Sequence, residues 1–415
     1  MSFLHFLWRL LPARQRRETL FSVMAMMAPR IEKAVPPAVG PYTVAGFFGS
    51  SSGLGEGARR LADMLEAAGA IVYRADLSSA LRQSPNQPGL APPPPGPGTL
   101  LMHVNGPLLP WGLFELGRSV VARKRVFAVW NWELTSVPRD WDRGFRSVHG
   151  ILCTSRFVSK VMQRVGGPQT AIIHYPVPSP KLVPMTRSEL DLPTDAFVSL
   201  CVFDASSVVE RKNPMGAIAA HLGAFGDDPS KILVIKTYNT CMAGRGWHEV
   251  LQAAESHANI RIIDRKMSRE EVWSLMALSD VFVSLHRSEG VGLAPLEAMR
   301  LGRPVLATAW SGNMDFMDES NAALVPYKKV AARDERGVYS VCGAEWAEPN
   351  IERAAALLCR LFHDVAWRGA LGRAALARTS LLTEVSCGKH ALQVLAGLDA
   401  AAQGTPARFP HSLPL

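Results

Sequence analysis

The sequence predicts an α/β protein of two domains, each built on a parallel β-sheet covered by helices. Short apolar segments of strand character alternate with helical stretches along both halves of the 415 residues. Between the halves, the proline-rich segment 175–180 cannot continue a helix and is predicted to be a linker. The length suffices for two domains of ordinary size, and the 48% of hydrophobic residues suffice for two large cores.

The first half of the chain begins after a lead-in that contains Pro36, Pro37 and Pro41. Helical stretches are expected at 57–68 and 157–165. The segment 84–98 contains four consecutive prolines and is expected to be an exposed, mobile loop. The strands expected in this half are 43–48, 71–75, 100–104, 126–130, 151–154 and 171–174.

The second half repeats this alternation, with helices between its strands. Ligands of open α/β sheets bind at the carboxyl ends of the strands, so the residues that follow each strand are the candidates for a site. The strands expected here are 198–203, 232–236, 261–263, 281–285, 305–308 and 323–325. The candidate segments are 49–57, 103–107, 130–133, 203–212 and 289–293, together with Lys236.

The most informative segment is the glycine-rich turn after the strand at 281–285. A helix is predicted after Ala294, with Pro295 in its first turn and a stop at Gly302. Such a turn directs backbone N–H groups and the positive end of the helix dipole at one spot, which suits a phosphate. Glu289 lies at the turn, and Glu297 lies further along the helix, where a carboxylate can accept hydrogen bonds from ribose hydroxyls. The pattern indicates a nucleoside diphosphate sugar.

Charge and cysteine content restrict the class of partner and the compartment. The net charge of +9 favours an anionic partner, such as a sugar nucleotide, a lipid phosphate or an anionic membrane. Nucleic acid is not expected, because no Lys/Arg run is interleaved with aromatic residues. The six cysteines form no close pairs and no metal-type spacing, so we expect reduced thiols and a cytoplasmic location.

The apolar segment 3–11 leaves two interpretations open. It is too short to span a membrane, and Arg14, Arg16 and Arg17 follow it, whereas a secretory signal places its charge first. An apolar face beside a basic cluster can lie on an anionic membrane, which would place the protein at the inner face of the cell membrane as a peripheral protein. The alternatives are a terminal helix packed on the domain and a disordered end.

Several of these motifs together resemble the retaining glycosyltransferases of the GT-B fold, family 4 (group 1). The resemblance covers roughly 43–387. It is carried by the Glu-x7-Glu pair Glu289 and Glu297, by the segment 211–214 (Arg-Lys-Asn-Pro), by Lys236 at the end of a strand, and by the Gly-rich segment 53–59. It implies two Rossmann-like parallel-sheet domains that face each other across a cleft. The implied division is a basic, amphipathic lead-in at 1–40, an acceptor-side domain at 41–178, a donor-binding domain at 181–385, and a helix end with a disordered tail at 386–415.

The resemblance also implies roles for the donor-binding residues. Glu297 would hold the donor ribose, and Glu289 would contact the donor sugar or its phosphate. Lys236 and either Arg211 or Lys212 would assist backbone amides in binding the diphosphate. These backbone amides are those of Gly290, Gly292 and Leu293. The base would lie near Arg265 and Lys266. The loop with Gly53 and Gly55 would approach the donor phosphate from the opposite domain. Neither a metal nor another cofactor is expected.

The residues that act from the amino-terminal domain are left open. Many family members place a histidine near the reacting sugar, and here either His103 or Asn105 can take that place. Glu133, which follows Trp130 and Trp132 in the segment Trp-Asn-Trp-Glu, is a further candidate, since two rings and a carboxylate suit a sugar. The alternative is that both tryptophans belong to the core and Glu133 caps a turn.

Two further motifs differ from, or compete with, this family. Members often carry Gly-Arg where this chain has Phe203-Asp204, so Arg211 and Lys212 are expected to supply the positive charge. The segment 49–55 also fits the turn of short-chain dehydrogenases, with Asp76 near a ribose-binding position. None of the six tyrosines has a lysine four residues later, however, which argues against that class. Asp140 and Asp142 are interpreted as residues of a helix start and not as metal ligands.

The expected activity is transfer of a hexose of mannose or glucose type, with retention, from a UDP- or GDP-sugar to a hydroxyl group. The expected acceptor is a growing, lipid-linked glycan in bacterial exopolysaccharide or lipopolysaccharide synthesis. A catalytically inactive paralogue that binds glycan or scaffolds polysaccharide assembly is the alternative from another class. A nucleotide-sugar epimerase is a third interpretation, which would need no acceptor.

Overall fold

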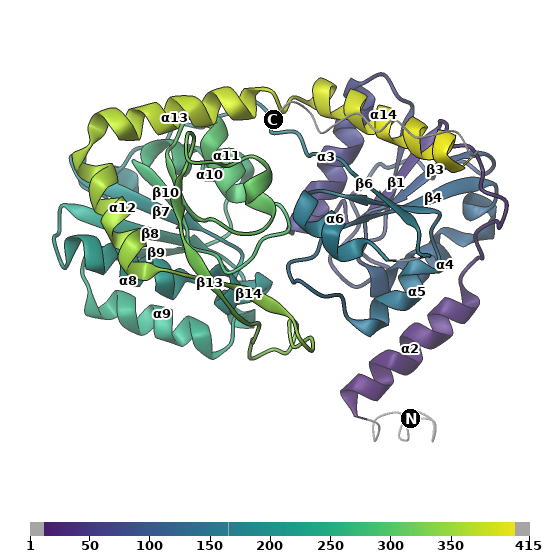
Figure 1. The fold of residues 1–415 in the computed structure, drawn as a ribbon, viewed down its shortest axis with the longest axis horizontal. Coiled ribbons are helices and arrows are strands. Elements are labelled where there is room, and N and C mark those ends of the chain that lie inside the picture. The colour runs from purple at the N-terminus through teal and green to yellow at the C-terminus, as the bar shows by residue number, and fades with distance from the viewer. Residues whose placement is uncertain (1–11, 165, 403–415) are drawn as a thin grey trace. The chain divides into compact units, whose positions relative to one another are not determined.

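The computed structural model describes residues 12–164 and 166–402 (Figure 1). Its contacts divide the chain into two units. The first unit comprises the chain up to Asn131, then Val137–Pro176, and the part from Glu384 onward. The second unit comprises Trp132–Ser136 and Val177–Thr383. The chain therefore enters the second unit briefly after Asn131, and its last helix returns to the first unit.

The first unit is built on a six-stranded sheet in the order β2-β1-β3-β4-β5-β6, in which every pair of neighbours is parallel. Its central strands are fully buried, as expected for a parallel sheet covered on both faces. The strands are β1 (Tyr42–Gly46), β2 (Val72–Asp76), β3 (Gly98–Met102), β4 (Lys124–Trp130), β5 (Gly150–Cys153) and β6 (Gln169–Ile172).

The helices of the first unit pack closely where small residues meet. A Cβ atom on Gly46 would lie 2.8 Å from that of Ala58, and one on Gly388 would lie 1.8 Å from the carbonyl oxygen of Met64. The first contact places the helix that contains Ala58 on the sheet. The second packs the last helix of the chain against that same helix. The helices are α2 (Ala13–Met27), α3 (Gly53–Ala67), α4 (Leu109–Val121), α5 (Asp142–Phe145), α6 (Arg156–Met162) and α14 (Glu384–Ala402).

The second unit contains another six-stranded parallel sheet, in the order β12-β11-β10-β7-β8-β9. Its core combines strand residues such as Leu233, Ile235 and Val283 with the apolar faces of the surrounding helices. The strands are β7 (Phe197–Val202), β8 (Lys231–Thr237), β9 (Ile260–Asp264), β10 (Val281–Ser284), β11 (Val305–Thr308) and β12 (Ala323–Val325).

Helices cover both faces of this second sheet, with α8, α9 and α12 on one side and α10, α11 and α13 on the other (Figure 1). Their starts follow ordinary capping rules: Ser268 and Glu271 form a capping box on α10, and Asn213 caps α8. Gly302, with φ of 67°, follows the end of α11 as expected. The helices are α7 (Val209–Lys212), α8 (Pro214–Phe225), α9 (Arg245–Ser256), α10 (Arg269–Leu278), α11 (Leu293–Arg300), α12 (Ile351–His363) and α13 (Val365–Ser380).

Every strand expected from the sequence is present, with ends that differ by about two residues. The sequence did not predict an antiparallel hairpin formed by β13 (Tyr327–Ala331) and β14 (Glu345–Pro349). Its first strand is largely exposed and contains Lys328 and Lys329, so the apolar alternation that marks a strand is weak there. In the part of the chain that the structure describes, no helix combines the length and hydropathy needed to cross a membrane.

Candidate functional site

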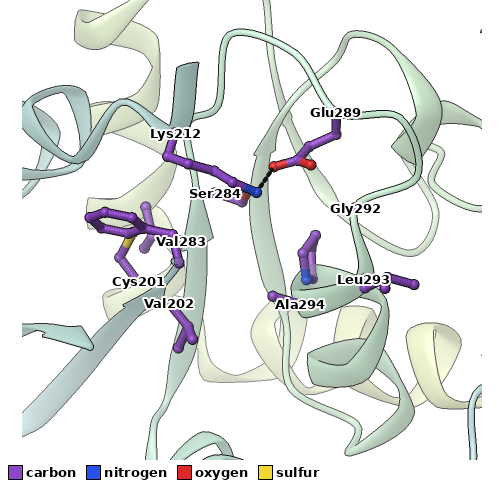
Figure 2. A pocket seen from close by; sticks show the side chains of 11 residues that line it. Cys201, Val202, Lys212, Val283, Ser284, Glu289, Gly292, Leu293 and Ala294 are labelled. Atoms are coloured by element: carbon purple, nitrogen blue, oxygen red, sulfur yellow. Dashed lines mark hydrogen bonds and ion pairs between the residues drawn. The ribbon is translucent and has the colours of Figure 1, made fainter. Parts of the chain in front are cut away.

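A small hollow lies at the carboxyl ends of β7 and β10 in the second unit (Figure 2). Its volume is about 320 Å³ when the open solvent at its mouth is counted, and only about 20 Å³ of it can hold the centre of a water molecule. Polar groups enter it from Lys212 and Glu289, and the start of α11 forms one wall. The lining residues are Cys201, Val202, Phe203, Lys212, Val283, Ser284, Glu289, Gly292, Leu293, Ala294 and Pro295.

The glycine-rich turn after β10 is held in place by a second turn, after β11. The backbone N–H of Glu289 donates to Ser311 Oγ at 2.8 Å, and the N–H of Gly312 donates to the carbonyl oxygen of Glu289 at 3.0 Å. The two turns touch so closely that a Cβ atom on Gly312 would lie 2.1 Å from the carbonyl oxygen of Gly290. This contact fixes the path of the turn before it enters the helix.

The start of α11 presents backbone donors to the hollow. Gly292 occupies the N-cap with φ of 91°, and no side chain caps the helix there. The first N–H groups of a helix have no partner within it, and they carry the positive end of its dipole. Because Gly292, Leu293 and Ala294 line the hollow, this end of α11 favours an anion inside it.

Glu289 is bound by two cations. Lys212 Nζ lies 2.5 Å from Oε1, and Arg211 Nη1 lies 3.2 Å from Oε2 (Figure 2 shows the first contact). Burial alone would raise the pKa of this carboxyl group, but Lys212, Arg211 and His286 together lower it to about 2. Glu289 is therefore ionised, and it holds both cations at the edge of the hollow.

The segment with Arg211 is tied to the same turn through its neighbours. Arg211 Nη1 donates to the carbonyl oxygen of Ser288 at 2.7 Å, and the N–H of Arg287 donates to the carbonyl oxygen of Arg211 at 2.8 Å. Asn213, in the left-handed region with φ of 54°, donates from Nδ2 to the carbonyl oxygen of Leu285 at 2.8 Å. The expected grouping of Arg211, Lys212 and Glu289 is thus present in the structure.

Lys236 lies away from this grouping, at the ends of β8 and β9. Its ammonium donates to the carbonyl oxygens of Thr237 at 3.0 Å and Arg265 at 2.7 Å. Burial lowers the pKa of Lys236 to about 8. The side chains of Arg265 and Lys266 are exposed in the loop that follows β9. Lys236 therefore anchors the backbone of that loop, and its contact with a diphosphate stays a prediction.

Glu297 occupies the second turn of α11 and is half-buried. It does not line the hollow that contains Glu289. The two glutamates thus lie on different sides of the turn-to-helix junction: one in the turn, the other on the helix. The two glutamates therefore do not form a carboxylate pair, and their positions fit separate contacts with a ligand.

In the first unit, hydrogen bonds hold the loop before α3. Ser52 Oγ accepts a hydrogen bond from the N–H of Gly55 at 3.3 Å, which caps the helix. Arg59 Nη1 donates to the carbonyl oxygens of Phe48 and Ser50, both at 2.8 Å. A Cβ atom on Gly55 would lie 2.3 Å from the carbonyl oxygen of Ser50, so this position requires glycine. Gly53 is the first residue of α3, and a Cβ atom there would have no neighbour within 4 Å.

His103 is fully buried in the first unit and forms a hydrogen bond through Nε2 with the hydroxyl of Tyr175. Burial lowers its pKa to about 4, so the imidazole is neutral near pH 7. Gly57 allows this pair to form, because a Cβ atom there would lie 2.7 Å from both polar atoms. Asn105 is half-buried, and its Oδ1 has no hydrogen-bond partner among the described residues.

Both tryptophans of the 130–133 segment are core residues. Trp130 is fully buried and packs edge-on against Trp141 and Phe145. Trp132 is 7% exposed, and its Nε1 donates to the carbonyl oxygen of Ser136 at 2.8 Å. The alternative in which both rings are core therefore describes the structure.

Comparison with known proteins supports a glycosyltransferase architecture. Residues 231–335 match the family model described as "Glycosyl transferases group 1". A search of curated proteins finds no match to the sequence. Among solved structures, Anabaena HepE in complex with UDP and glucose is 13% identical, with a TM-score of 0.59, and the match covers 86% of this chain and 99% of HepE. Sucrose-phosphate synthase from Thermosynechococcus elongatus is 17% identical, with a TM-score of 0.61, and the match covers 87% and 99%.

The chain has the GT-B fold. This confirms the fold class expected from the sequence, with its two parallel-sheet units. The matched residues 231–335 lie in the second unit and include β10, the glycine-rich turn and α11. The segment that matches the group 1 glycosyltransferase model thus includes the turn that contains Glu289.

The structure adds one residue that the sequence analysis of this GT-B chain did not select. Tyr339, in the loop between β13 and β14, is 5% exposed and donates its hydroxyl to Glu133 Oε2 at 3.1 Å. Its ring faces the Arg211 guanidinium, 5.7 Å from ring centre to Cζ. No strand end or motif marks Tyr339 in the sequence, because it lies within the irregular loop of the unpredicted hairpin. The Asp140 and Asp142 pair lies at a helix start, and Asp142 pairs with Arg164.

Proposed function

We propose that this protein is a retaining glycosyltransferase that transfers a hexose from a nucleoside diphosphate sugar to a hydroxyl group. The observation that carries the proposal is the binding of Glu289 between Lys212 and Arg211, beside the uncapped start of α11. Two cations and a set of backbone donors at one hollow suit a diphosphate. The Glu289 carboxylate, which lies among these cations and donors, suits the hydroxyl groups of a sugar attached to the diphosphate.

In the proposed reaction, the bond between the anomeric carbon and the diphosphate oxygen breaks, and its electron pair stays on that oxygen. Lys212, Arg211 and the first N–H groups of α11 would stabilise the charge that develops there, at about 3 kcal/mol for each well-placed group. The acceptor oxygen forms the new bond on the same face, and its proton passes to the leaving phosphate. We assign this charge stabilisation to the protein cations without a metal, so chelators should leave the activity unchanged.

We propose that Glu297 binds the donor ribose and that the loop with Arg265 and Lys266 lies near the base. HepE, a structural neighbour, was solved with UDP and glucose, and UDP- and GDP-sugars are the donors that we consider. A thermal-shift panel of UDP, GDP, ADP and their sugars tests the proposal. Marked stabilisation by one nucleotide series would identify the donor class. Absence of stabilisation by every member would count against the transferase.

We propose that the acceptor hydroxyl is contacted by a side chain from the amino-terminal part of the sequence, with Asn105, His103 and Glu133 as the candidates. The partner-free Oδ1 of Asn105 supports Asn105, since a buried acceptor without a partner is costly unless a ligand supplies the donor. His103 already bonds to Tyr175, and Glu133 already bonds to Tyr339. Asn105→Ala should therefore lower transfer more than it lowers donor binding, which kinetics with saturating donor would show.

We further propose that the acceptor is a lipid-linked glycan of bacterial polysaccharide synthesis and that the protein works at the membrane surface. Helix α2 supports this, because Leu20, Val23 and Met27 are exposed along one face and Met26 is 77% exposed. Co-sedimentation with vesicles containing anionic phospholipid tests the membrane contact. Binding should weaken in a variant with Val23, Met26 and Met27 changed to serine. Equal sedimentation of both proteins would contradict it.

A further inference from the structure

The hairpin loop 332–344 places one aromatic ring against Arg211, next to the candidate site. Within this loop, Asp334 accepts hydrogen bonds from the backbone N–H groups of Val338 at 3.0 Å and Tyr339 at 2.6 Å. These bonds set the backbone that carries Tyr339. The Tyr339 side chain is almost completely buried, although the loop around it is largely exposed. The loop therefore delivers this one side chain inward.

The same loop is attached to the helix that carries Arg211. The N–H of Glu335 donates to Glu210 Oε1 at 3.2 Å, and Arg336 Nη1 donates to the carbonyl oxygen of Ser206 at 2.7 Å. Arg287 joins the hairpin to α7 directly, because it pairs with Glu348 on β14 at 2.6 Å and donates to the carbonyl oxygen of Glu210 at 2.6 Å. Tyr339 and Arg211 thus belong to one connected body within the second unit.

Tyr339 offers Arg211 a contact that orients a cation without neutralising it. The face of an aromatic ring attracts a guanidinium through its quadrupole, and it carries no net charge. A second carboxylate in direct contact with the guanidinium would instead cancel more of the charge that an anionic ligand needs. The Tyr339 hydroxyl bonds to Glu133, and Trp132 packs at 5.7 Å from the ring, so the ring itself is held in orientation.

We infer that Tyr339 is a positioning residue for Arg211, and that Glu133 acts through Tyr339 by holding its hydroxyl. This inference rests on the proposed function, in which Arg211 binds the diphosphate. One further observation supports it: Arg211 is 3% exposed, yet its Nε has no hydrogen-bond partner among the described residues. The guanidinium is therefore held by Ser288, Glu289 and the ring, and its Nε–H adds no hydrogen bond among the described residues.

Tyr339→Leu tests the inference with the full-length protein. Calorimetric titration with inorganic pyrophosphate and with UDP and GDP measures the diphosphate affinity directly. We expect Tyr339→Leu to weaken pyrophosphate binding about tenfold, the size of a largely desolvated cation–π contact. Tyr327→Leu is the matched control, because Tyr327 is on the same hairpin but packs on Trp310, and it should bind like the wild type. Tyr339→Phe keeps the ring and should stay within about threefold of the wild type.

A double-mutant cycle separates positioning from a general structural role. In an Arg211→Gln background, Tyr339→Leu should cause no further loss of pyrophosphate affinity, because the residue that it positions is gone. Additive losses would overturn the inference, as would equal losses in Tyr339→Phe and Tyr339→Leu. Full affinity in Tyr339→Leu would also overturn it while leaving the proposed function intact.

A milder variant keeps the inference testable if Tyr339→Leu fails to fold. Glu133→Gln should weaken pyrophosphate binding about threefold, and this loss should disappear in a Tyr339→Phe background, where the hydroxyl is absent. An undiminished loss there would overturn the role given to Glu133. If the wild-type protein binds neither pyrophosphate nor any nucleoside diphosphate, the proposed function fails, and the inference fails with it.

Discussion

Lys212 and Glu289 are 77 positions apart in the chain, but Lys212 Nζ and Glu289 Oε1 are 2.5 Å apart in the structure. Arg211 approaches the other carboxylate oxygen at 3.2 Å. The carboxylate thus contacts both of the cations that the proposed diphosphate would use. We expect donor binding to be an exchange of partners, in which the phosphate oxygens bind the cations and Glu289 contacts the sugar.

Glu289→Gln separates binding from transfer. We expect UDP or GDP to bind more tightly to this variant, because removal of the carboxylate relieves its repulsion of the diphosphate and leaves Lys212 and Arg211 free for it. Transfer should fall by about 100-fold, since a contact to the reacting sugar is lost. Calorimetry and a coupled nucleotide-release assay measure the two effects. Glu345→Gln, which removes an exposed carboxylate of the same unit, serves as the control. Weaker nucleotide binding in Glu289→Gln would contradict the exchange of partners.

Lys212→Met should reduce nucleoside diphosphate affinity by about tenfold or more while leaving binding of the uncharged nucleoside unchanged. The aliphatic stem is kept, so the loss reports the charge. Titrations at several salt concentrations should show a weaker salt dependence in Lys212→Met than in the wild type. An equal loss for nucleoside and nucleoside diphosphate would place Lys212 away from the phosphates.

Gly312→Ala should disturb the turn that carries Glu289. Its Cβ atom would lie 2.1 Å from the carbonyl oxygen of Gly290, and both groups are backbone, so one turn must move. We expect a loss of about 1–3 kcal/mol in the free energy of unfolding and weaker nucleotide binding. Gly246→Ala is the matched control, because that glycine is within α9 and its Cβ would have ordinary contacts only. A Gly312→Ala protein with wild-type stability and affinity would show that the contact between the turns is unimportant.

His103 predicts a pH dependence of stability. Its folded pKa is lowered to about 4, below the ordinary value of 6.5, because the buried imidazole is poorly solvated when charged. The stabilisation is fully present above pH 6.5 and is lost as the pH falls from 6.5 to 4, by about 3 kcal/mol in total. His103→Gln should flatten this part of the profile in denaturant titrations, because glutamine does not titrate. An unchanged slope in the variant would show that other groups cause it.

The hydrophobic pattern was sufficient to predict the two sheets and every one of their strands. Buried parallel strands are continuous apolar segments bounded by turn residues, as at 281–285 and 305–308, so a local pattern identifies them. The hairpin of β13 and β14 lacks this signal. Its first strand exposes Lys328 and Lys329, and its attachment to the rest of the unit includes the contact of Arg287 with Glu348, which no local pattern encodes.

In the candidate site, too, some features have a local sequence signal and others do not. The glycine-rich turn, its helix and the Arg211-Lys212 segment each have a local signature, and the rule that ligands bind at the carboxyl ends of strands predicted that they meet. The direction of each side chain had no such signature. Lys236 also ends a strand, yet its ammonium turns to the carbonyl oxygens of Thr237 and Arg265, because burial at that position requires hydrogen-bond acceptors.

The sequence by itself thus determined the fold class, the order of the strands along the chain and the position of the turn that contains Glu289. Periodicity and turn chemistry act over a few residues, so they can be recognised without the rest of the molecule. Only the tertiary structure decided that Lys212 pairs with Glu289, that Tyr339 faces Arg211, and that both tryptophans beside Glu133 are core. These relationships join residues far apart in the chain, and they depend on burial and on competition among partners, which packing alone decides.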